Sequence, residues 1–351
     1  MSPRRIITVT AIMVVALLAG LGVTWSKAHP RIIELSFREQ GTSANADKQT
    51  LDSIRKVGNL YTVNYHGDYE ERLQWLNDYH LKKAAGLSTP SICSLFATCT
   101  TSGEPLLGRN LDRRDIPVLA RFAAPGKYAS FALSPSIEVH LQDVLNTQPT
   151  EIQKNNFLFA LPFYPTDGIN EKGLAIGIAG APLRRVKRSE TRQPMFVLLF
   201  IRRVLDNCQN VDETARFAET ASLYDRAIDT ISHHFLVTDA NGNWLVIDYP
   251  DGNLRLTRGQ GKAVARTNHF LDGGPSSADT RTSFSRYDKL HEELNSGKLL
   301  ASDSEAMALL KRVCDSTAWS VVYESRGRCA LLAVRENYRR QYRFGFQEEE
   351  Q

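Results

Sequence analysis

The stretch CSLFATCTTSGEPLLGRNLD, residues 93–112, predicts a β-hairpin. Residues 93–98 are small and apolar, and residues 105–111 resume an apolar run after a polar turn centred on Gly103. A tight hairpin returns its second strand alongside its first. Side chains from the two ends of this stretch are therefore expected to lie close together.

Three of these side chains carry reactive chemistry. Arg109 and Asp112 follow Cys93 by 16 and 19 residues, which places all three at one end of the predicted hairpin. A guanidinium beside a thiol favours the thiolate, which is the reactive form of cysteine. The alternative interpretation of the spacing is a buried cysteine at a strand start and an Arg–Asp pair on the surface.

The segments CSLFA, residues 93–97, and GRNLD, residues 108–112, resemble the start of the mature chain in the choloylglycine hydrolase group of N-terminal-nucleophile hydrolases. This group includes bile salt hydrolases and penicillin V acylases, with acid ceramidase and penicillin-side-chain acyltransferases as more distant relatives. The resemblance implies self-cleavage between Ile92 and Cys93. It further implies that Arg109 stands beside the cysteine and that Asp112 holds the new α-amino group.

Two more segments strengthen the resemblance. DGINEKGL, residues 167–174, matches a turn of the family, which we interpret as structural because its glycines permit positive φ. Where many bile salt hydrolases have an oxyanion-hole asparagine shortly after this turn, the chain has Gly180. Asn268, in the segment RTNHF, matches the family's other oxyanion asparagine. A distal active-site arginine is matched by Arg286, in the segment SFSR, with Arg281 as the alternative.

The order of predicted elements favours an α+β fold. The resemblance, which extends over residues 93–346, implies an αββα sandwich of two mainly antiparallel sheets flanked by helices. Helices are expected at 194–206, at 211–222 behind an Asn210–Glu213 capping pair, up to about residue 294, and at 302–314. Strands are expected at 235–238, 244–249, 254–257, 263–267, 319–323, 330–334 and 342–346. The adjacent His233 and His234 point to opposite faces of a strand and are interpreted as structural.

The N-terminus predicts export. Arg4 and Arg5 precede an apolar run over residues 6–25, which is long for a cleaved signal and long enough to span a bilayer. Ser26 and Ala28 supply small residues for cleavage after residue 28. Residues 1–28 are therefore a signal peptide or a membrane anchor, and the protein is expected in the periplasm, outside the cell or anchored to the membrane.

Residues 29–92 are predicted to be a propeptide-like segment before an N-terminal-nucleophile domain over residues 93–351. The segment is not simply polar, because residues 60–65 alternate like a strand and residues 69–87 have helical spacing. The alternative is an ordinary N-terminal subdomain.

The composition indicates which binding partners are poorly supported. Of 351 residues, 42% are hydrophobic and 23% charged, with a net charge of +4. Apart from residues 184–188 the chain has no basic run, so nucleic-acid binding is poorly supported. The five cysteines show no metal-site spacing, and neither a metal nor a cofactor is predicted.

The predicted function is hydrolysis of linear N-acyl amides through a thioester on Cys93. The alternatives are an acyltransferase that passes the acyl group to an amine, and a non-catalytic exported protein that retains the fold. Arg113 is compatible with the non-catalytic alternative, because the family often has an aromatic residue at that position. Apolar residues 118–122 and 157–163 are expected near an acyl pocket. Because of Gly180, aromatic or fatty acyl amides rank above bile salts as substrates.

Overall fold

The hairpin expected at residues 93–112 lies inside a seven-stranded sheet in the computed structural model of the protein. Its strands are β4 (Ile92–Cys99) and β5 (Pro105–Asp112), which pair antiparallel. The structure describes residues 30–35, 46–66, 69–83, 92–113, 115–136, 161–187, 189–225, 227, 229–272 and 278–346.

The seven-stranded sheet is antiparallel except at one edge. Its order is β1 (Arg31–Glu34), β18 (Arg340–Gly345), β17 (Cys329–Val334), β16 (Thr317–Glu324), β5, β4 and β15 (Val264–Arg266). Only β1 and β18 run parallel within it. The parallel partner at this edge comes from the segment upstream of Cys93.

The second sheet has nine strands and the same character. Its order is β14 (Arg255–Gln260), β13 (Asn243–Asp248), β12 (Thr230–Thr238), β9 (Ala175–Arg185), β8 (Asp167–Asn170), β7 (Ser130–Pro135), β6 (Pro117–Phe122), β3 (Leu60–Tyr65) and β2 (Arg55–Val57). Its one parallel pair is β3 with β6. Again the parallel strand lies upstream of Cys93.

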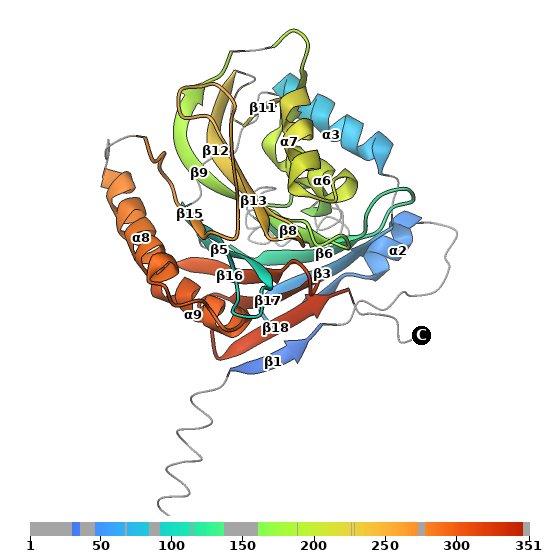
Figure 1. Cartoon of the computed structure of the whole chain (residues 1–351). Coiled ribbons are helices and arrows are strands. Elements are labelled where there is room, and N and C mark those ends of the chain that lie inside the picture. The colour runs from blue at the N-terminus through green and yellow to red at the C-terminus, as the bar shows by residue number, and fades with distance from the viewer. Residues whose placement is uncertain are drawn as a thin grey trace, which may run out of the picture.

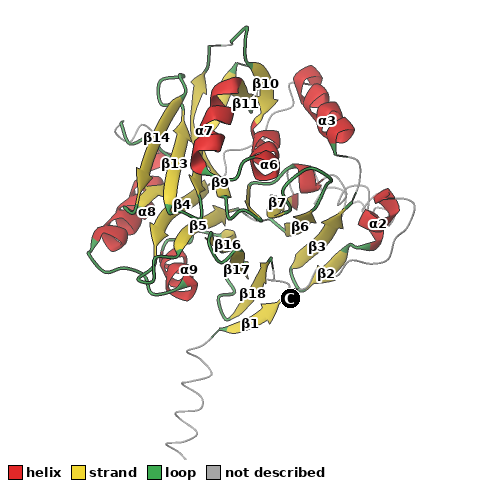
Figure 2. Cartoon of the chain, turned by 45° about the vertical axis from the view of Figure 1, so that its right-hand side comes forward, coloured by secondary structure: helices red, strands yellow, loops and turns green. Residues whose placement is uncertain are grey.

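Helices cover the outer faces of the two sheets (Figures 1 and 2). On the seven-stranded sheet, α8 (Ala278–Asn295) and α9 (Asp303–Arg312) bury Leu290 and Leu310 against Phe96. On the nine-stranded sheet, α3 (Glu70–Lys83), α6 (Val197–Asn207) and α7 (Val211–Thr220) form the outer layer. A third apolar core, with Leu95 and Leu236, fills the space between the sheets. The predicted α+β sandwich with layers αββα is confirmed.

Two predicted helix ends were wrong. The helix expected from residue 194 begins at Val197, because residues 193–196 form β10 (Gln193–Phe196). The helix expected to reach residue 222 ends at Thr220, where β11 (Ala221–Tyr224) begins. These two short strands pair with each other in parallel and bury Phe196 and Tyr224. A pairing between segments that are distant in the sequence cannot be recognised from local hydrophobic periodicity.

Two other predicted helix starts are confirmed by their caps. The side chain of Asn210 accepts the N–H of Glu213 at 2.9 Å, and that of Ser302 accepts the N–H of Glu305 at 3.3 Å. Each N-cap therefore satisfies one of the backbone donors that a helix leaves open in its first turn.

The segment upstream of Cys93 is built into both sheets. The strand predicted at residues 60–65 is β3, and all six of its residues are buried. β1 extends the other sheet, and the short helix α2 (Ala46–Asp52) packs on β3. In the part of the chain that the structure describes, no helix is long and apolar enough to cross a membrane. Residues 6–25 lie outside that part.

Candidate active site

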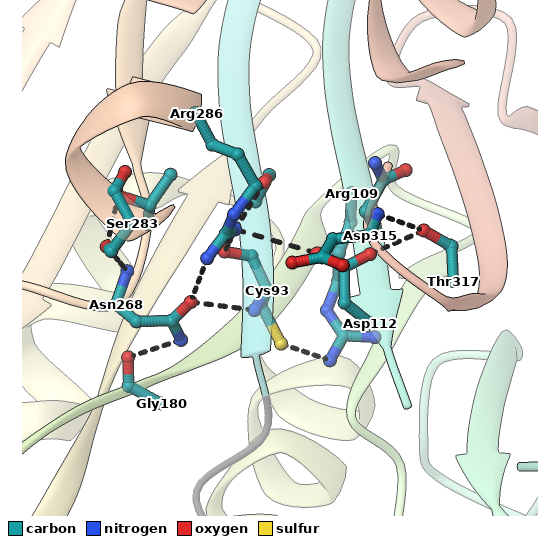
Figure 3. Close-up of polar contacts among 12 residues, drawn as sticks. Cys93, Arg109, Asp112, Gly180, Asn268, Ser283, Arg286, Asp315 and Thr317 are labelled. Atoms are coloured by element: carbon teal, nitrogen blue, oxygen red, sulfur yellow. Dashed lines mark hydrogen bonds and ion pairs between the residues drawn. The ribbon is translucent and has the colours of Figure 1, made fainter. Parts of the chain in front are cut away.

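Cys93 lies near the start of β4 and is completely buried. The Nη2 of Arg109 donates to its sulfur at 3.5 Å, across the hairpin from β5 (Figure 3). The hairpin thus places a cation beside the thiol of Cys93.

Arg109 is held by a buried network between the two sheets. Its Nε donates to the carbonyl of Ile178 at 3.0 Å, and its Nη1 forms an ion pair with Asp167. Burial lowers the pKa of Arg109, but the Asp167 carboxylate and the Cys93 sulfur outweigh this effect and raise it above its usual value. The guanidinium therefore stays charged in the core.

Asp167 is a residue that the sequence analysis treated only as part of a structural turn. In addition to Arg109, it accepts hydrogen bonds from Tyr323 and, at 3.2 Å, from Trp319. Its position at the start of the 167–174 segment was visible in the sequence, but its partner lies 58 residues away. Nothing local indicates that contact.

Asp112 ends β5 and faces the predicted cleavage point, since it pairs with Ile92 in the sheet register. The hydroxyl of Thr317 donates to its Oδ1, and Arg286 lies 3.6 Å from its Oδ2. Burial raises the pKa of Asp112 to about 6, although Thr317 and Arg286 act to lower it. The carboxyl group can therefore change its charge near neutral pH.

Asn268 follows β15 and contacts the backbone of the cysteine. Its Oδ1 accepts the Cys93 N–H at 2.9 Å, while its Nδ2 donates to the carbonyl of Gly180 at 2.9 Å (Figure 3). The hydroxyl of Ser283 accepts the Asn268 N–H at 2.7 Å and fixes this loop. Gly180 thus supplies a backbone acceptor for the Asn268 side chain.

Arg286 reaches the same point from α8. Its Nη1 donates to the carbonyl of Cys93 at 2.5 Å and to the hydroxyl of Ser94 at 2.7 Å. Its Nη2 donates to the Oδ1 of Asn268 at 2.8 Å. The alternative, Arg281, lies on the same helix, but its side chain is outside the described residues.

The five predicted site residues therefore meet at one end of the seven-stranded sheet. Asp167, Thr317 and Ser283 were not predicted as site residues; their side chains contact Arg109, Asp112 and Asn268 respectively. In the described ranges, no group of three or more His, Cys, Asp or Glu side chains is arranged to hold a metal ion.

The remaining predictions concern two histidines and two apolar segments outside this cluster. His233 contacts Asp225 at 2.7 Å, and burial lowers the pKa of His234 to about 3. Residues 118–122 belong to β6 and pack in the core, as do residues 161–163. The expectation that these apolar segments lie near an acyl pocket stays a prediction. Residues 157–160 lie outside the described part of the chain.

Comparison with known proteins agrees with the class indicated by fold and site. A family model described as acyl-coenzyme A:6-aminopenicillanic acid acyl-transferase matches residues 160–330. This match agrees with the resemblance to the N-terminal-nucleophile hydrolases, whose relatives include penicillin-side-chain acyltransferases. No curated protein sequence matches the chain.

Solved structures that are similar to the chain in part include the following three. Penicillin V acylase from Agrobacterium tumefaciens has 18% identity and a TM-score of 0.47, with 69% of this chain and 83% of that chain covered. Conjugated bile acid hydrolase from Clostridium perfringens has 14% identity and a TM-score of 0.46, with 69% and 89% covered. The Caenorhabditis elegans ortholog of N-acylethanolamine-hydrolyzing acid amidase has 14% identity and a TM-score of 0.44, with 73% and 100% covered.

Proposed function

We propose that this protein hydrolyses linear N-acyl amides, with Cys93 as a nucleophile that becomes the N-terminal residue by self-cleavage after Ile92. One observation carries the proposal: the sulfur of Cys93 contacts Arg109, while its backbone N–H contacts Asn268. These are the two atoms that an N-terminal nucleophile uses, the thiol for attack and the amino nitrogen for proton transfer.

Self-cleavage would use the same atoms. The Cys93 sulfur adds to the Ile92 carbonyl carbon, the carbon–nitrogen bond breaks, and the nitrogen takes up a proton. Water then hydrolyses the thioester, which releases the Ile92 carboxylate and restores the thiol. The new α-amino group titrates at roughly 7.7–8.0 when unperturbed, so it can serve as the general base at neutral pH.

In the proposed catalytic cycle each group has one role. The Cys93 sulfur, which lies beside Arg109, attacks the substrate carbonyl and forms a thioester, while the α-amino group passes the thiol proton to the leaving amine. Water then hydrolyses the thioester, which releases the acyl group as a carboxylate and restores the thiol. Asp112 and Arg286 hold the amino group and the Asn268 side chain. Asn268 can donate to the oxyanion once its Nδ2 leaves the Gly180 carbonyl, and one such donor is worth about 10²–10³ in rate.

The first experiment is the intact mass of the purified protein. We expect two fragments divided between Ile92 and Cys93, and a single uncut chain for Cys93→Ala. Amine release is then measured with phenoxyacetyl, long-chain acyl and cholyl amides, with Cys93→Ser as the comparison. We rank aromatic and fatty acyl amides first. An active wild-type protein that remains uncut at Cys93 would contradict the proposal.

Acyl transfer is the second candidate, favoured by the acyl-transferase family model that matches residues 160–330. It would use the same residues, with an amine in place of water as the acyl acceptor. Product analysis with added amines separates the two reactions. Cleavage without either reaction would favour a non-catalytic role. We place the activity outside the cytoplasm, in the periplasm, the exterior or at a membrane anchor formed by residues 6–25.

A further inference from the structure

Unusual backbone geometry gathers near the proposed site. In the described part of the chain, the non-glycine residues with positive φ are Ser316 (58°), Arg328 (52°), Arg335 (51°) and Glu336 (56°). This conformation is unfavourable for L-residues, because Cβ crowds the backbone, and it persists only where the surroundings impose it. All but Arg328 line one cavity of about 530 Å³, where β16 begins and β17 ends.

Arg335 and Glu336 occupy the centre of a tight turn. The N–H of Asn337 donates to the carbonyl of Val334 at 3.1 Å and closes it. Two central residues with positive φ are the mark of a type I′ turn, for which Asn-Gly is the favoured pair. Because this chain has Arg-Glu instead, both central residues of the turn hold an unfavourable backbone conformation.

The side chain of Glu336 has a definite contact. Its Oε1 accepts the backbone N–H of Thr317 at 2.8 Å, and the N–H of Arg335 donates to the carbonyl of Ala318 at 2.7 Å. The strained turn is thus attached to the first residues of β16.

β16 is itself irregular at this point. Its register against β5 shifts between Thr317 and Trp319, which is a bulge of the kind that redirects a side chain. The hydroxyl of Thr317 accepts the N–H of Asp315 at 3.3 Å and donates to the Oδ1 of Asp112. The bulge and the left-handed Ser316 before it therefore serve to aim this one hydroxyl.

The consequence for Asp112 is a difference between its two oxygens. Thr317 donates to Oδ1, whereas Oδ2 is buried, faces Arg286 at 3.6 Å and accepts no hydrogen bond from any described residue. Oδ2 is thus left as the oxygen for the amino group that cleavage would create at Cys93.

We propose that Thr317 and Glu336 are positioning residues for Asp112, and that the strained 334–337 turn is kept because it places the Glu336 carboxylate on Thr317. The inference rests on the proposed function, in which Asp112 holds the α-amino group of Cys93. Neither residue is required to touch the substrate.

The expected signature is a change in how Asp112 titrates. The ionisable groups around it are Arg286 on α8, Asp315 and Cys314 before β16, and Cys93 on β4. The Thr317 hydroxyl stabilises the ionised carboxylate, so its removal moves the titration of Asp112 to higher pH while these neighbours are unchanged.

Thr317→Val removes the hydroxyl while keeping the shape. We expect the acid limb of the kcat/KM profile to move to higher pH, and kcat/KM to fall about tenfold or more, as for a lost hydrogen bond to a charged group. Glu336→Ala should act in the same direction with a smaller effect. Glu336→Gln keeps an oxygen for the Thr317 N–H and should stay close to wild type.

The turn itself is tested by Arg335→Asn combined with Glu336→Gly, which gives it the favoured pair. We expect the Tm to rise by about 1–3 °C while kcat/KM falls. Arg328→Gly relaxes a left-handed residue at the opposite end of the same sheet and should leave kcat/KM unchanged.

The Asp112 carboxyl should also be titrated by NMR in the Cys93→Ala protein, with Asp112→Asn to assign its signal. An unchanged titration in both Thr317→Val and Glu336→Ala would overturn the inference. The NMR readout does not need activity, so it separates this failure from a failure of the proposed function, which would appear as an uncut and inactive wild type.

Discussion

Two strands on either side of the predicted cleavage point are held in different ways. β4, just after it, belongs to an antiparallel hairpin whose partner β5 follows after a short turn. β3, upstream of it, pairs in parallel with β6 and lies in the interior of the other sheet. The hairpin is therefore a local structure, whereas the upstream strand depends on contacts made far along the chain.

This difference bears on the structural role of the segment upstream of Cys93. A propeptide that merely covers a nucleophile could leave without loss to the fold, but β3 contributes Leu60 to the core between the sheets and Tyr65 to the core under α6. We infer that this segment remains part of the folded protein after any cleavage at Cys93.

The largest expected effect comes from removing it. A chain of residues 93–351 alone should fail to fold, because the edge of β6 and the two apolar cores are left open to water. Near-UV circular dichroism should lack the wild-type signal, and thermal unfolding should lose its cooperativity. Wild-type fragments cut at Cys93 should instead elute together in native buffer and separate in denaturant. A cooperative transition at the wild-type Tm for residues 93–351 would show that the segment is dispensable.

The next prediction tests the β4–β5 hairpin with Asp167→Ala, because Asp167 pairs with Arg109 on β5. This change leaves the buried Arg109 without its ion-pair partner, and breaking such a pair usually costs about 3–5 kcal/mol in free energy of unfolding. Chemical denaturation in the Cys93→Ala background measures the cost without interference from cleavage. Arg343→Gln disturbs a partly exposed charge cluster in the same sheet and serves as the comparison. Equal losses for the two variants would mean that the Arg109 pair has no special weight.

A pH-dependent effect follows from Asp112. Its folded pKa of about 6 lies above the usual value of 3.8, so the folded state favours the proton. This contribution to stability is complete below about pH 3.8 and is lost as pH rises through 6. Relative to the Cys93→Ala parent, Asp112→Asn should therefore gain about 2–3 kcal/mol in unfolding free energy between pH 4 and pH 8. A difference that stays constant with pH would indicate that Asp112 titrates normally in the fold.

The sequence predicted what depends on local pattern or on the family motifs. The hairpin, the capped helix starts at Asn210 and Ser302 and the layered fold were accessible in this way. The contacts of Asp167 and Thr317 were not, because each joins residues more than 50 positions apart. The strands β10 and β11 were not predicted for the same reason. Each is short and is formed by pairing with the other, which its own local sequence does not indicate.

The smallest expected effect tests the docking of the upstream segment at one hydrogen bond. The hydroxyl of Tyr69, just before α3, donates to the buried carboxylate of Asp206 on α6, which also pairs with Arg202. Tyr69→Phe should lower the free energy of unfolding by about 1–3 kcal/mol, because it leaves one oxygen of a buried carboxylate without its donor.

The neighbouring Glu70 supplies the matched control. It forms ion pairs with Lys127 and Arg203, but its side chain is 55% exposed. Glu70→Gln should therefore change stability by no more than about 1 kcal/mol, since water screens exposed pairs. Both variants are compared by urea denaturation of the uncut Cys93→Ala protein. If Tyr69→Phe costs no more than Glu70→Gln, the buried Tyr69–Asp206 contact adds nothing to the attachment of the upstream segment.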